Sequence, residues 1–294
     1  MSRIITSLAE IAEGYDGLFC DLWGCLHNGV RPFEEAVAAL RRFRSEGGRV
    51  LLLTNAPRPR VQVGRQLDRM GVPHDCYDAI VSSGDAAQAG LLSGSFGARV
   101  YHIGTERDAT FFEEVAADIP RRVEIQRVPL AEAESIVCTG LFDDETETPD
   151  DYRATYLEGV NRGLKFLCAN PDIFVDRGEQ RLYCAGALAA AYAERGGEVH
   201  YFGKPHAPIY TLARQRLNEV AGEEIADDRI LAIGDGILTD IAGGVGDGFD
   251  TLFVAGGLAA EETGMRNGQP DPAQLARFLD KHRLSPTASI GMLR

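Results

Sequence analysis

Long apolar runs are absent from this sequence of 294 residues, and no stretch reaches the roughly 18 consecutive apolar residues that a membrane-spanning helix needs. Basic residues are few: 30 Lys and Arg face 44 Asp and Glu, which leaves a net charge of −14. Nucleic acids and anionic membranes are normally bound by clustered Lys and Arg, so neither is expected as a partner. An anionic ligand would therefore need a local device, such as a metal ion.

Cysteine pairs of the Cys-x-x-Cys type are also absent, although the sequence contains six cysteines. Most of them lie in apolar, strand-like runs, as expected of buried and reduced thiols. This spacing argues against a zinc site. The N-terminus has no evident export signal, so the sequence predicts a cytoplasmic protein.

The two ends of the sequence alternate between strand-like and helical patterns. Strands are expected at 17–22, 50–55 and 79–83, and helices at 33–47 and 59–71. Near the C-terminus we expect helices at 207–221, after Thr239 and at 272–283, and strands at 229–234 and 251–256. The run VLLLTN shows no polar alternation, which is typical of a strand covered on both faces. This alternation of strands and helices predicts an α/β fold with a parallel sheet covered by helices.

The middle of the chain carries strand and helix patterns of its own, including VYHIG, ESIVCTG and LKFLCANPD. They interrupt the alternation of the two ends and indicate an insertion into the first sheet. Two domains are therefore predicted. Residues 1–83 and 191–294 would form the core, and residues 84–190 the inserted domain.

Polar residues capable of chemistry follow several of the core strands. They are Asp21, Thr54, Asn55, Lys204 in FGKPH, and Asp235 and Asp240 in GDGILTD. Open parallel sheets bind ligands at the carboxyl ends of their strands. Taken singly, each residue also has a structural explanation as a helix cap or a turn residue.

As a set, these residues point to Mg²⁺-assisted phosphoryl transfer. Carboxylate oxygens bind Mg²⁺, while lysine and hydroxyl groups donate to phosphate oxygens as charge redistributes. One carboxylate would remain to act as a nucleophile, because an aspartate can form an acyl-phosphate intermediate that divides a difficult displacement into two easier ones.

These motifs resemble the haloacid dehalogenase superfamily, and within it the class IIA phosphatases related to nitrophenylphosphatases and nucleotide phosphatases. The residues that carry the resemblance are Asp21 with Gly24 and Gly29, Thr54-Asn55, Gly203-Lys204-Pro205, Gly234-Asp235 and Thr239-Asp240. Asn170-Pro171-Asp172 and the segment AGALAAAY are also similar to class IIA sequences. The resemblance implies a Rossmann-like core with an α+β cap of the C2 type inserted near Ser83.

The resemblance also implies roles for the acidic residues. Asp21 would be the nucleophile and, through its carboxylate, a Mg²⁺ ligand. Trp23 would offer only its backbone carbonyl to the metal. Asp235 would be a further ligand, and Asp240 a supporting or metal-linked carboxylate.

The remaining roles concern the substrate, which the resemblance implies is a small phosphorylated metabolite. Thr54 and the Asn55 backbone would hold its phosphate, and Lys204 would steady both nucleophile and phosphate. Asn170 and Asp172 would border the substrate from the cap, although a plain turn explains them equally well. Dimerisation through the cap would be in keeping with the class, and no residue demonstrates it.

Trp23 departs from the family pattern, in which a second aspartate usually stands two positions after the nucleophile. That aspartate protonates the leaving oxygen and later activates water, and an indole can do neither. His27 is a candidate replacement because its pKa lies near working pH, although a turn residue is the simpler reading. Arg58 and Arg60 are candidate substrate contacts or a solvated helix start, and His206 is a weaker candidate for acid-base chemistry.

Three functions from different classes remain open. A Mg²⁺-dependent phosphatase with atypical acid-base chemistry is favoured, because every expected metal and phosphate position is kept. A catalytically silent relative that binds a phosphorylated ligand is the second. The third is a metal-independent dehalogenase, since such enzymes carry an aromatic residue at the position of Trp23, but Asp235 and Asp240 would then have no use.

Overall fold

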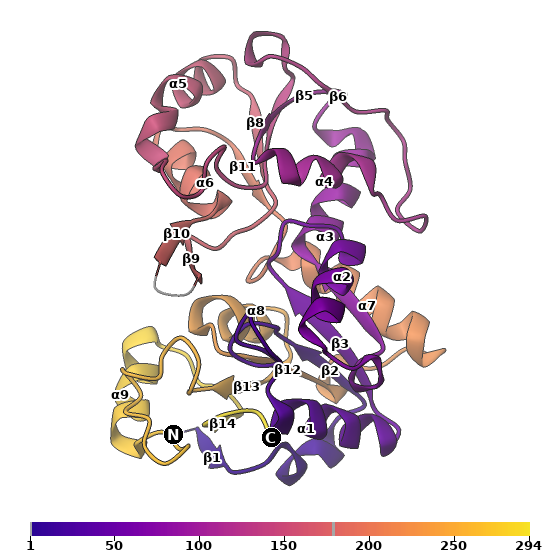
Figure 1. Cartoon of the computed structure of the whole chain (residues 1–294), viewed down its shortest axis with the longest axis vertical. Helices are drawn as coiled ribbons and strands as arrows, with labels where there is room; N and C mark the ends of the chain where they lie inside the picture. Colours follow the sequence, from indigo (N-terminus) through magenta and orange to yellow (C-terminus); the bar gives the residue numbers. More distant parts are fainter. Residues whose placement is uncertain (1, 178–179) are drawn as a thin grey trace. The chain divides into compact units, whose positions relative to one another are not determined.

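The computed structural model describes residues 2–177 and 180–294, which divide into two compact units (Figure 1). The core unit comprises the chain up to Thr54, residues 64–81 and residues 210–294. The inserted unit comprises residues 55–63 and 82–209. Each unit contains a larger sheet of its own.

The core unit is built on a seven-stranded sheet with the order β1-β14-β13-β12-β2-β3-β4. The pairings from β1 across to β3 are parallel. The strands are β1 (Arg3–Ile5), β2 (Gly17–Cys20), β3 (Arg49–Thr54), β4 (Ala79–Ser82), β12 (Ile230–Gly234), β13 (Asp250–Val254) and β14 (Ala288–Ile290). Helices α1 (Glu34–Ser45), α8 (Ala242–Gly246) and α9 (Pro272–His282) belong to this unit, whereas α2 (Arg60–Met70) and α7 (Ala207–Ala221) cross its boundary.

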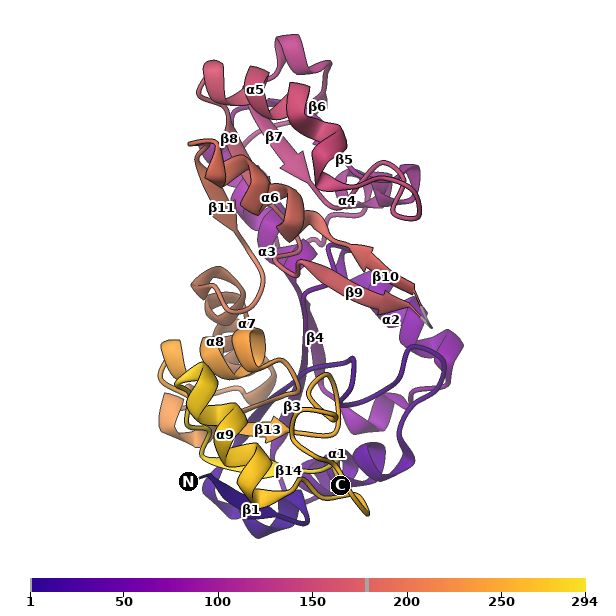
Figure 2. The ribbon, with the colours of Figure 1, turned by 90° about the vertical axis from the view of Figure 1, so that its left-hand side faces the viewer.

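The predicted strands and longer helices of the core lie within two residues of their expected bounds at each end, whereas strands β1 and β14 were not expected. Strand β2 is buried at every position, and β3 at all but its first, which matches their uninterrupted apolar runs. Helix α9 begins where the Asp271 side chain accepts hydrogen bonds from two backbone N–H groups and Pro272 occupies the first helical turn. Its apolar side chains pack against β13 through Phe253, and Figure 2 shows the helix lying across β13 and β14.

The inserted unit has a five-stranded, wholly parallel sheet with the order β11-β8-β7-β5-β6. Its strands are β5 (Arg99–Ile103), β6 (Gln126–Arg127), β7 (Ser135–Cys138), β8 (Lys165–Cys168) and β11 (Val199–Tyr201), and β9 (Phe174–Arg177) and β10 (Gln180–Tyr183) form a separate antiparallel hairpin. Its helices are α3 (Ser83–Gly90), α4 (Thr110–Glu113), α5 (Arg153–Asn161) and α6 (Ala185–Glu194). Tyr156 of α5 and Tyr192 of α6 are fully buried in its core. The predicted α/β class with a second, inserted domain is confirmed.

The inserted unit extends further along the chain than the predicted 84–190. Its contacts continue to Ile209, and residues 55–63 also belong to it. The physical reason is strand pairing: β11 pairs with β8, so the chain completes the second sheet before it returns to the first. A boundary at 190 would fall inside α6.

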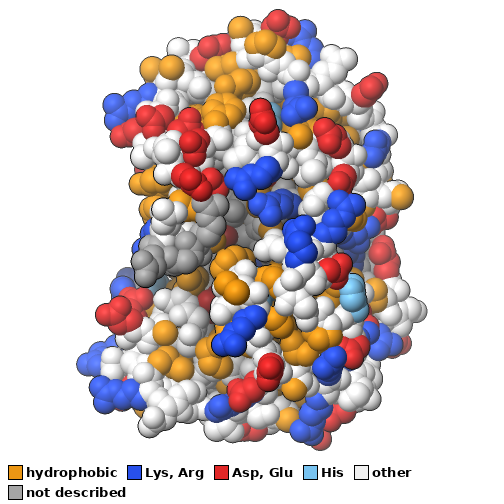
Figure 3. Space-filling view, in the orientation of Figure 1, with side chains coloured by type: hydrophobic (Ala, Val, Ile, Leu, Met, Phe, Trp, Pro, Cys, Tyr) orange, Lys and Arg blue, Asp and Glu red, His pale blue; other side chains and the backbone are white. Residues whose placement is uncertain are grey.

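The surface has no large field of one charge on the face drawn in Figure 3, where acidic and basic side chains are interspersed. All six cysteines are buried and free, as their apolar surroundings predict. In the described part of the chain, no helix is both long enough and apolar enough to cross a membrane.

Candidate active site

Two predicted site carboxylates lie at the ends of neighbouring strands in the centre of the core sheet. Asp21 follows β2 and Asp235 follows β12, and these two strands pair in parallel. The backbone N–H of Asp21 donates to the Ile233 carbonyl over 2.9 Å, which extends the pairing to the end of the strands. Both aspartates are buried, at 8% and 4% exposure. The parallel register therefore places these two acidic residues close together.

Asp21, Asp235 and Cys25 can each direct one ligand atom to a common point, and these atoms lie within 4.8 Å of one another. Burial and the neighbouring aspartates raise the pKa of the Cys25 thiol well above its usual value, and sulfur is a soft donor that suits a cation such as Mg²⁺ poorly. The donors that remain are two carboxylates, which suit a hard cation such as Mg²⁺. Asp21 and Asp235 thus fit the metal that the sequence implied, and Cys25 does not take part.

Glycines make room for the Asp235 carboxylate. A Cβ atom at Gly24 or at Gly257 would lie 2.0 Å from Asp235 Oδ2. The backbone N–H of Leu258 donates to the same oxygen over 2.9 Å. Both glycines thus permit a close approach that fixes the orientation of this carboxylate.

Replacing Gly257 is expected to weaken metal binding. In Gly257→Ala the new methyl group forces Asp235 to move, and loss of such support typically costs about 10- to 100-fold in metal affinity. The half-saturating Mg²⁺ concentration for activity, or for thermal stabilisation, should rise by that factor. Gly246→Ala is the matched control, because a Cβ there meets nothing within 4 Å. An unchanged Mg²⁺ requirement in Gly257→Ala would contradict a metal-binding role for Asp235.

Asp240 lies in a single π turn, Ile237–Ile241, that directly follows β12. Its Oδ2 accepts hydrogen bonds from the Gly236 backbone N–H at 3.1 Å and from Thr239 Oγ1 at 3.4 Å. Among the described residues, Asp240 is not part of the group formed by Asp21 and Asp235. This arrangement favours the supporting role, in which Asp240 shapes the turn that carries Asp235.

Trp23 packs on its own loop. Its ring centre lies 5.4 Å from that of His27 in an edge-to-face contact, and a Cβ at Gly29 would lie 2.3 Å from the indole. The side chain is still 37% exposed. Gly29 has φ +85°, so it provides both the left-handed turn and the space beside the ring.

His27 is buried, and its environment opposes a role as a general acid. Its Nδ1 accepts a hydrogen bond from the Gly29 backbone N–H over 3.0 Å. Burial lowers the pKa of the imidazole to about 4. At neutral pH the ring is therefore neutral and has no easily released proton, which favours the reading of His27 as a turn residue.

The inserted unit brings together a second set of predicted residues. Asn55 and Lys204 pair in both directions: the Lys204 N–H donates to Asn55 Oδ1 over 2.7 Å, and Asn55 Nδ2 donates to the Lys204 carbonyl over 3.0 Å. Asn55 Nδ2 also donates to Asp172 Oδ1 over 2.8 Å. Asn170 Oδ1 accepts from the Asp172 N–H in an Asx turn. Segments that are far apart in sequence thus converge on the Asn55 side chain.

The sequence analysis assigned no role in the site to two residues of this second set. A Cβ at Gly203 would lie 2.5 Å from Asn55 Oδ1 and 2.7 Å from Ser83 Oγ, so only glycine fits there. Ser83 is fully buried, and its hydroxyl has no hydrogen-bond partner among the described residues. The motif Gly203-Lys204-Pro205 could have drawn attention to the glycine, but no sequence signal marks Ser83.

The remaining predicted site residues each lie in a different environment. Thr54, at the end of β3, is 4% exposed. Arg58 is exposed, so its predicted substrate contact stays a prediction. Arg60 contacts Asp85 and Asp118, which favours a structural role at the start of α2. His206 stacks on Tyr201 with ring centres 4.6 Å apart.

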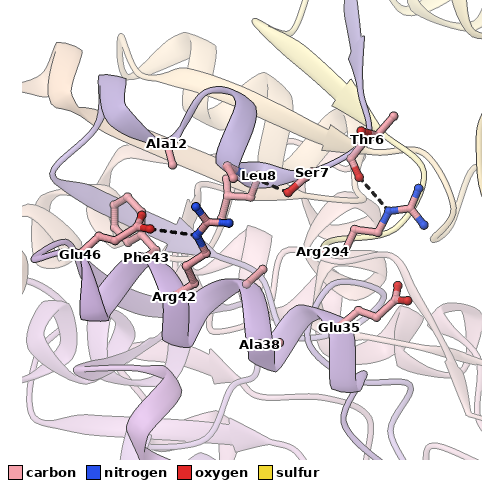
Figure 4. A pocket seen from close by; sticks show the side chains of 12 residues that line it. Thr6, Ser7, Leu8, Ala12, Glu35, Ala38, Arg42, Phe43, Glu46 and Arg294 are labelled. Atoms are coloured by element: carbon pink, nitrogen blue, oxygen red, sulfur yellow. Dashed lines mark hydrogen bonds and ion pairs between the residues drawn. The ribbon is translucent and has the colours of Figure 1, made fainter.

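A separate cavity of about 370 Å³ lies in the core unit, and it is lined by other residues than the predicted site (Figure 4). It lies between the turn Leu8–Glu10, helix α1 and the C-terminal residue. The polar groups labelled in Figure 4 include an Arg42–Glu46 ion pair and an Arg294 Nε donor to the Thr6 carbonyl. Among the described residues that line it, no predicted site residue occurs.

Comparison with known families gives two matches along the chain. A model described as haloacid dehalogenase-like hydrolase matches residues 18–118, and a second model of the same kind matches residues 201–282. Among curated proteins, the chain is 27% identical over 250 residues to the 5′-nucleotidase YutF of Bacillus subtilis. That alignment covers 84% of this chain and 90% of the relative.

Solved structures agree with these matches. A hydrolase of the haloacid dehalogenase-like family from Brucella suis is 40% identical, with a TM-score of 0.84 and coverage of 99% of this chain and 100% of that one. A glycerol phosphate phosphatase from Mycobacterium tuberculosis, in complex with magnesium, is 25% identical with a TM-score of 0.67, over 97% and 77% of the two chains. With its acidic pair at the ends of β2 and β12, the chain belongs to the haloacid dehalogenase superfamily of hydrolases, among the phosphatases of class IIA.

Proposed function

We propose that this phosphatase hydrolyses small phosphomonoesters through a covalent aspartyl-phosphate on Asp21, and that it favours substrates with good leaving groups. The observation that carries the proposal is the buried pair of Asp21 and Asp235, whose oxygens can share one cation. Relatives named for nucleotides and glycerol phosphate support a small phosphorylated metabolite as the substrate class.

The reaction would proceed in two displacements. A carboxylate oxygen of Asp21 attacks phosphorus and the bond to the leaving oxygen breaks, which leaves the phosphoryl group on the aspartate. Water then attacks phosphorus, the bond to Asp21 breaks, and inorganic phosphate is released. Mg²⁺, the cofactor of this class, would be held by Asp21, Asp235 and the Trp23 carbonyl, and supplies positive charge to the phosphoryl oxygens when bound.

Phosphate binding is assigned to Thr54, Asn55 and Lys204. Thr54 is the last residue of β3 and Asn55 follows it, so a hydroxyl donor and a backbone donor are consecutive at this strand end. The amide of Asn55 holds the Lys204 backbone on both sides, which restricts the lysine stem. Lysine is a point charge without directional preference, and a fixed stem therefore decides where that charge acts.

Trp23 determines the preference for good leaving groups. An indole has no acidic proton for the leaving oxygen, so an alkoxide would have to depart with its full negative charge. An aryl or acyl leaving group carries that charge more easily and needs little protonation. Hydrolysis of the aspartyl-phosphate, which needs an activated water, would then be the slow step.

The test is a series of phosphate esters whose leaving groups differ in pKa. We expect kcat/KM to fall by about 10²- to 10⁴-fold from p-nitrophenyl phosphate to glycerol phosphate, the range that general acid catalysis usually supplies. An initial burst of p-nitrophenol would report the slow second step. Equal rates for both esters would contradict the account of Trp23. Release of halide from a small haloacid in the presence of a chelator, without ester hydrolysis, would instead favour the metal-independent dehalogenase.

The second candidate function is binding of a phosphorylated ligand without catalysis. Trp23 favours it, because an indole stands where the related phosphatases usually have their second aspartate. It predicts stabilisation by Mg²⁺ together with inorganic phosphate, and no turnover of any ester. Under the phosphatase proposal, the same ligands stabilise the protein and the aryl ester is hydrolysed.

A further inference from the structure

The Asn55 side chain uses both hydrogens of its amide on two other segments of the inserted unit. Its Nδ2 donates to the Lys204 carbonyl over 3.0 Å and to Asp172 Oδ1 over 2.8 Å, while its Oδ1 accepts from the Lys204 N–H over 2.7 Å. An amide nitrogen carries two hydrogens, so each of them has an acceptor here. Asn55 is only 6% exposed, and the loss of one of these partners would therefore leave a buried polar atom unpaired.

These contacts permit one orientation of the Asn55 amide. If the group were reversed, its oxygen would face the Lys204 carbonyl and the Asp172 carboxylate, and its NH2 group would face the Lys204 N–H. Attractive contacts would thus become repulsive. Asp172 contributes strongly to this preference, because a hydrogen bond to a charged acceptor is about twice as strong as one between neutral groups.

The Asp172 carboxylate extends from a turn that is itself held in place. Asn170, which is 9% exposed, accepts from the Asp172 N–H through its Oδ1 over 3.0 Å. The same turn lies against the start of α6, where a Cβ at Gly186 would lie 2.5 Å from the Asp172 carbonyl oxygen. Two segments that resemble class IIA sequences, Asn170-Pro171-Asp172 and AGALAAAY, therefore meet at this point, and glycine at position 186 allows them to do so.

Lys204 is the residue on which this arrangement acts. The residue is 3% exposed, and Asn55 contacts both polar groups of its main chain. A Cβ at Gly203 would lie 2.5 Å from Asn55 Oδ1 and 2.5 Å from Pro171 Cδ, so the chain directly before Lys204 packs on the same two segments. The backbone from which the lysine side chain departs is therefore fixed, and a fixed stem decides where its point charge acts.

We propose that Asp172 is a positioning residue for phosphate binding, which fixes the Asn55 amide and, through it, the backbone of Lys204. This inference rests on the phosphate-binding role proposed for Lys204. It differs from the role that the family resemblance implies, in which Asp172 borders the substrate. A residue that borders the substrate acts on the leaving group, whereas a residue that acts through Lys204 affects the phosphate of every ligand alike.

Inorganic phosphate separates the two roles, because it carries no leaving group. In calorimetric titrations with saturating Mg²⁺, Asp172→Ala should weaken phosphate binding about tenfold, the effect of losing a hydrogen bond to a charged group. The kcat/KM values for p-nitrophenyl phosphate and acetyl phosphate, whose leaving groups differ in shape, should fall by one common factor. Unchanged phosphate affinity would overturn the inference. A loss confined to one ester would also overturn it, because it would indicate contact with the leaving group.

A conservative variant shows whether the hydrogen bond or the charge matters. Asp172→Asn keeps an oxygen that can accept from Asn55 Nδ2, so its phosphate affinity should stay within about threefold of the parent's. The inference fails if Asp172→Asn binds phosphate as weakly as Asp172→Ala. Asp150→Ala is the matched control, because it removes an exposed carboxylate of the same unit that pairs with Arg153 at the surface. Its phosphate affinity should equal that of the parent.

A reciprocal exchange tests the pair even if Asp172→Ala does not fold. Asn55→Asp replaces both donor contacts of the amide by repulsion and should weaken phosphate binding at least about tenfold. Adding Asp172→Asn supplies an N–H donor from position 172 and should recover about threefold of this loss. A folded double variant, as judged by its Tm, that recovers nothing would refute the inference. If the parent binds phosphate but hydrolyses no ester, the proposed hydrolysis fails, whereas the phosphate titrations still decide the role of Asp172.

Discussion

Asp21→Asn should abolish phosphate ester hydrolysis, with a loss of at least about 10⁴-fold in kcat/KM. The amide keeps the size of the carboxylate, but its oxygen is neutral and cannot form a stable bond to phosphorus. The substitution also removes one of the two negative charges that Asp21 and Asp235 offer to Mg²⁺. The measurement is steady-state turnover of p-nitrophenyl phosphate with saturating Mg²⁺, accompanied by a search for phosphorylated protein after rapid acid quench.

Asp280→Asn is the matched control, because it makes the same change at an exposed position in α9. Its turnover should equal that of the parent. Asp21→Asn must also keep the parent's Tm, so that lost activity reports chemistry rather than folding. Phosphorylated protein that persists in Asp21→Asn would place the covalent intermediate on another residue and refute the proposed nucleophile.

Trp23→Asp should increase kcat/KM for alkyl phosphates such as glycerol phosphate by about 10²- to 10⁴-fold. The new carboxylic acid stands at the position from which the related phosphatases protonate the leaving oxygen. At the same position it can activate the water that hydrolyses the aspartyl-phosphate, so the burst with p-nitrophenyl phosphate should disappear. A gain of this size corresponds to a barrier lower by about 3 to 5 kcal/mol.

Trp23→Asn separates acid-base chemistry from space. It removes the same indole and fills nearly the same volume as aspartate, but it cannot transfer a proton at neutral pH. We expect it to hydrolyse alkyl phosphates no faster than the parent. Two results would refute this account: a well-folded Trp23→Asp that is no faster than the parent, or a Trp23→Asn that gains as much as Trp23→Asp. The second result would mean that the bulk of the indole limits the reaction.

The central strands were predictable because their signal is strong and local. Strands β2, β3 and β12 are apolar runs bounded by turn residues, and burial on both faces leaves no competing helical pattern. Strands β1 and β14 were not predicted, since each has three residues and gains its structure from pairing with the other chain end. The hairpin of β9 and β10 escaped for a similar reason, because register depends on the partner strand.

Some residues of the site could likewise be predicted from the sequence, and others could not. Asp21 and Asp235 were predicted because each directly follows a recognisable strand, and a parallel sheet brings such positions to one edge. Gly257 and Cys25 were not predicted as their neighbours, since loop paths decide which backbone approaches a carboxylate. His27 shows the opposite case: its residue type suits proton transfer, but burial lowers the pKa of its imidazole to about 4.

The sequence by itself determined the α/β class, the presence of an insertion and the types of side chain available for chemistry, because these follow from apolar periodicity and from residues at strand ends. Only the tertiary structure decided where the insertion returns to the core, which backbone groups orient Asp235, and that the Asn55 amide pairs with the Lys204 backbone. These features depend on contacts between segments far apart in the chain, and no local pattern encodes such contacts.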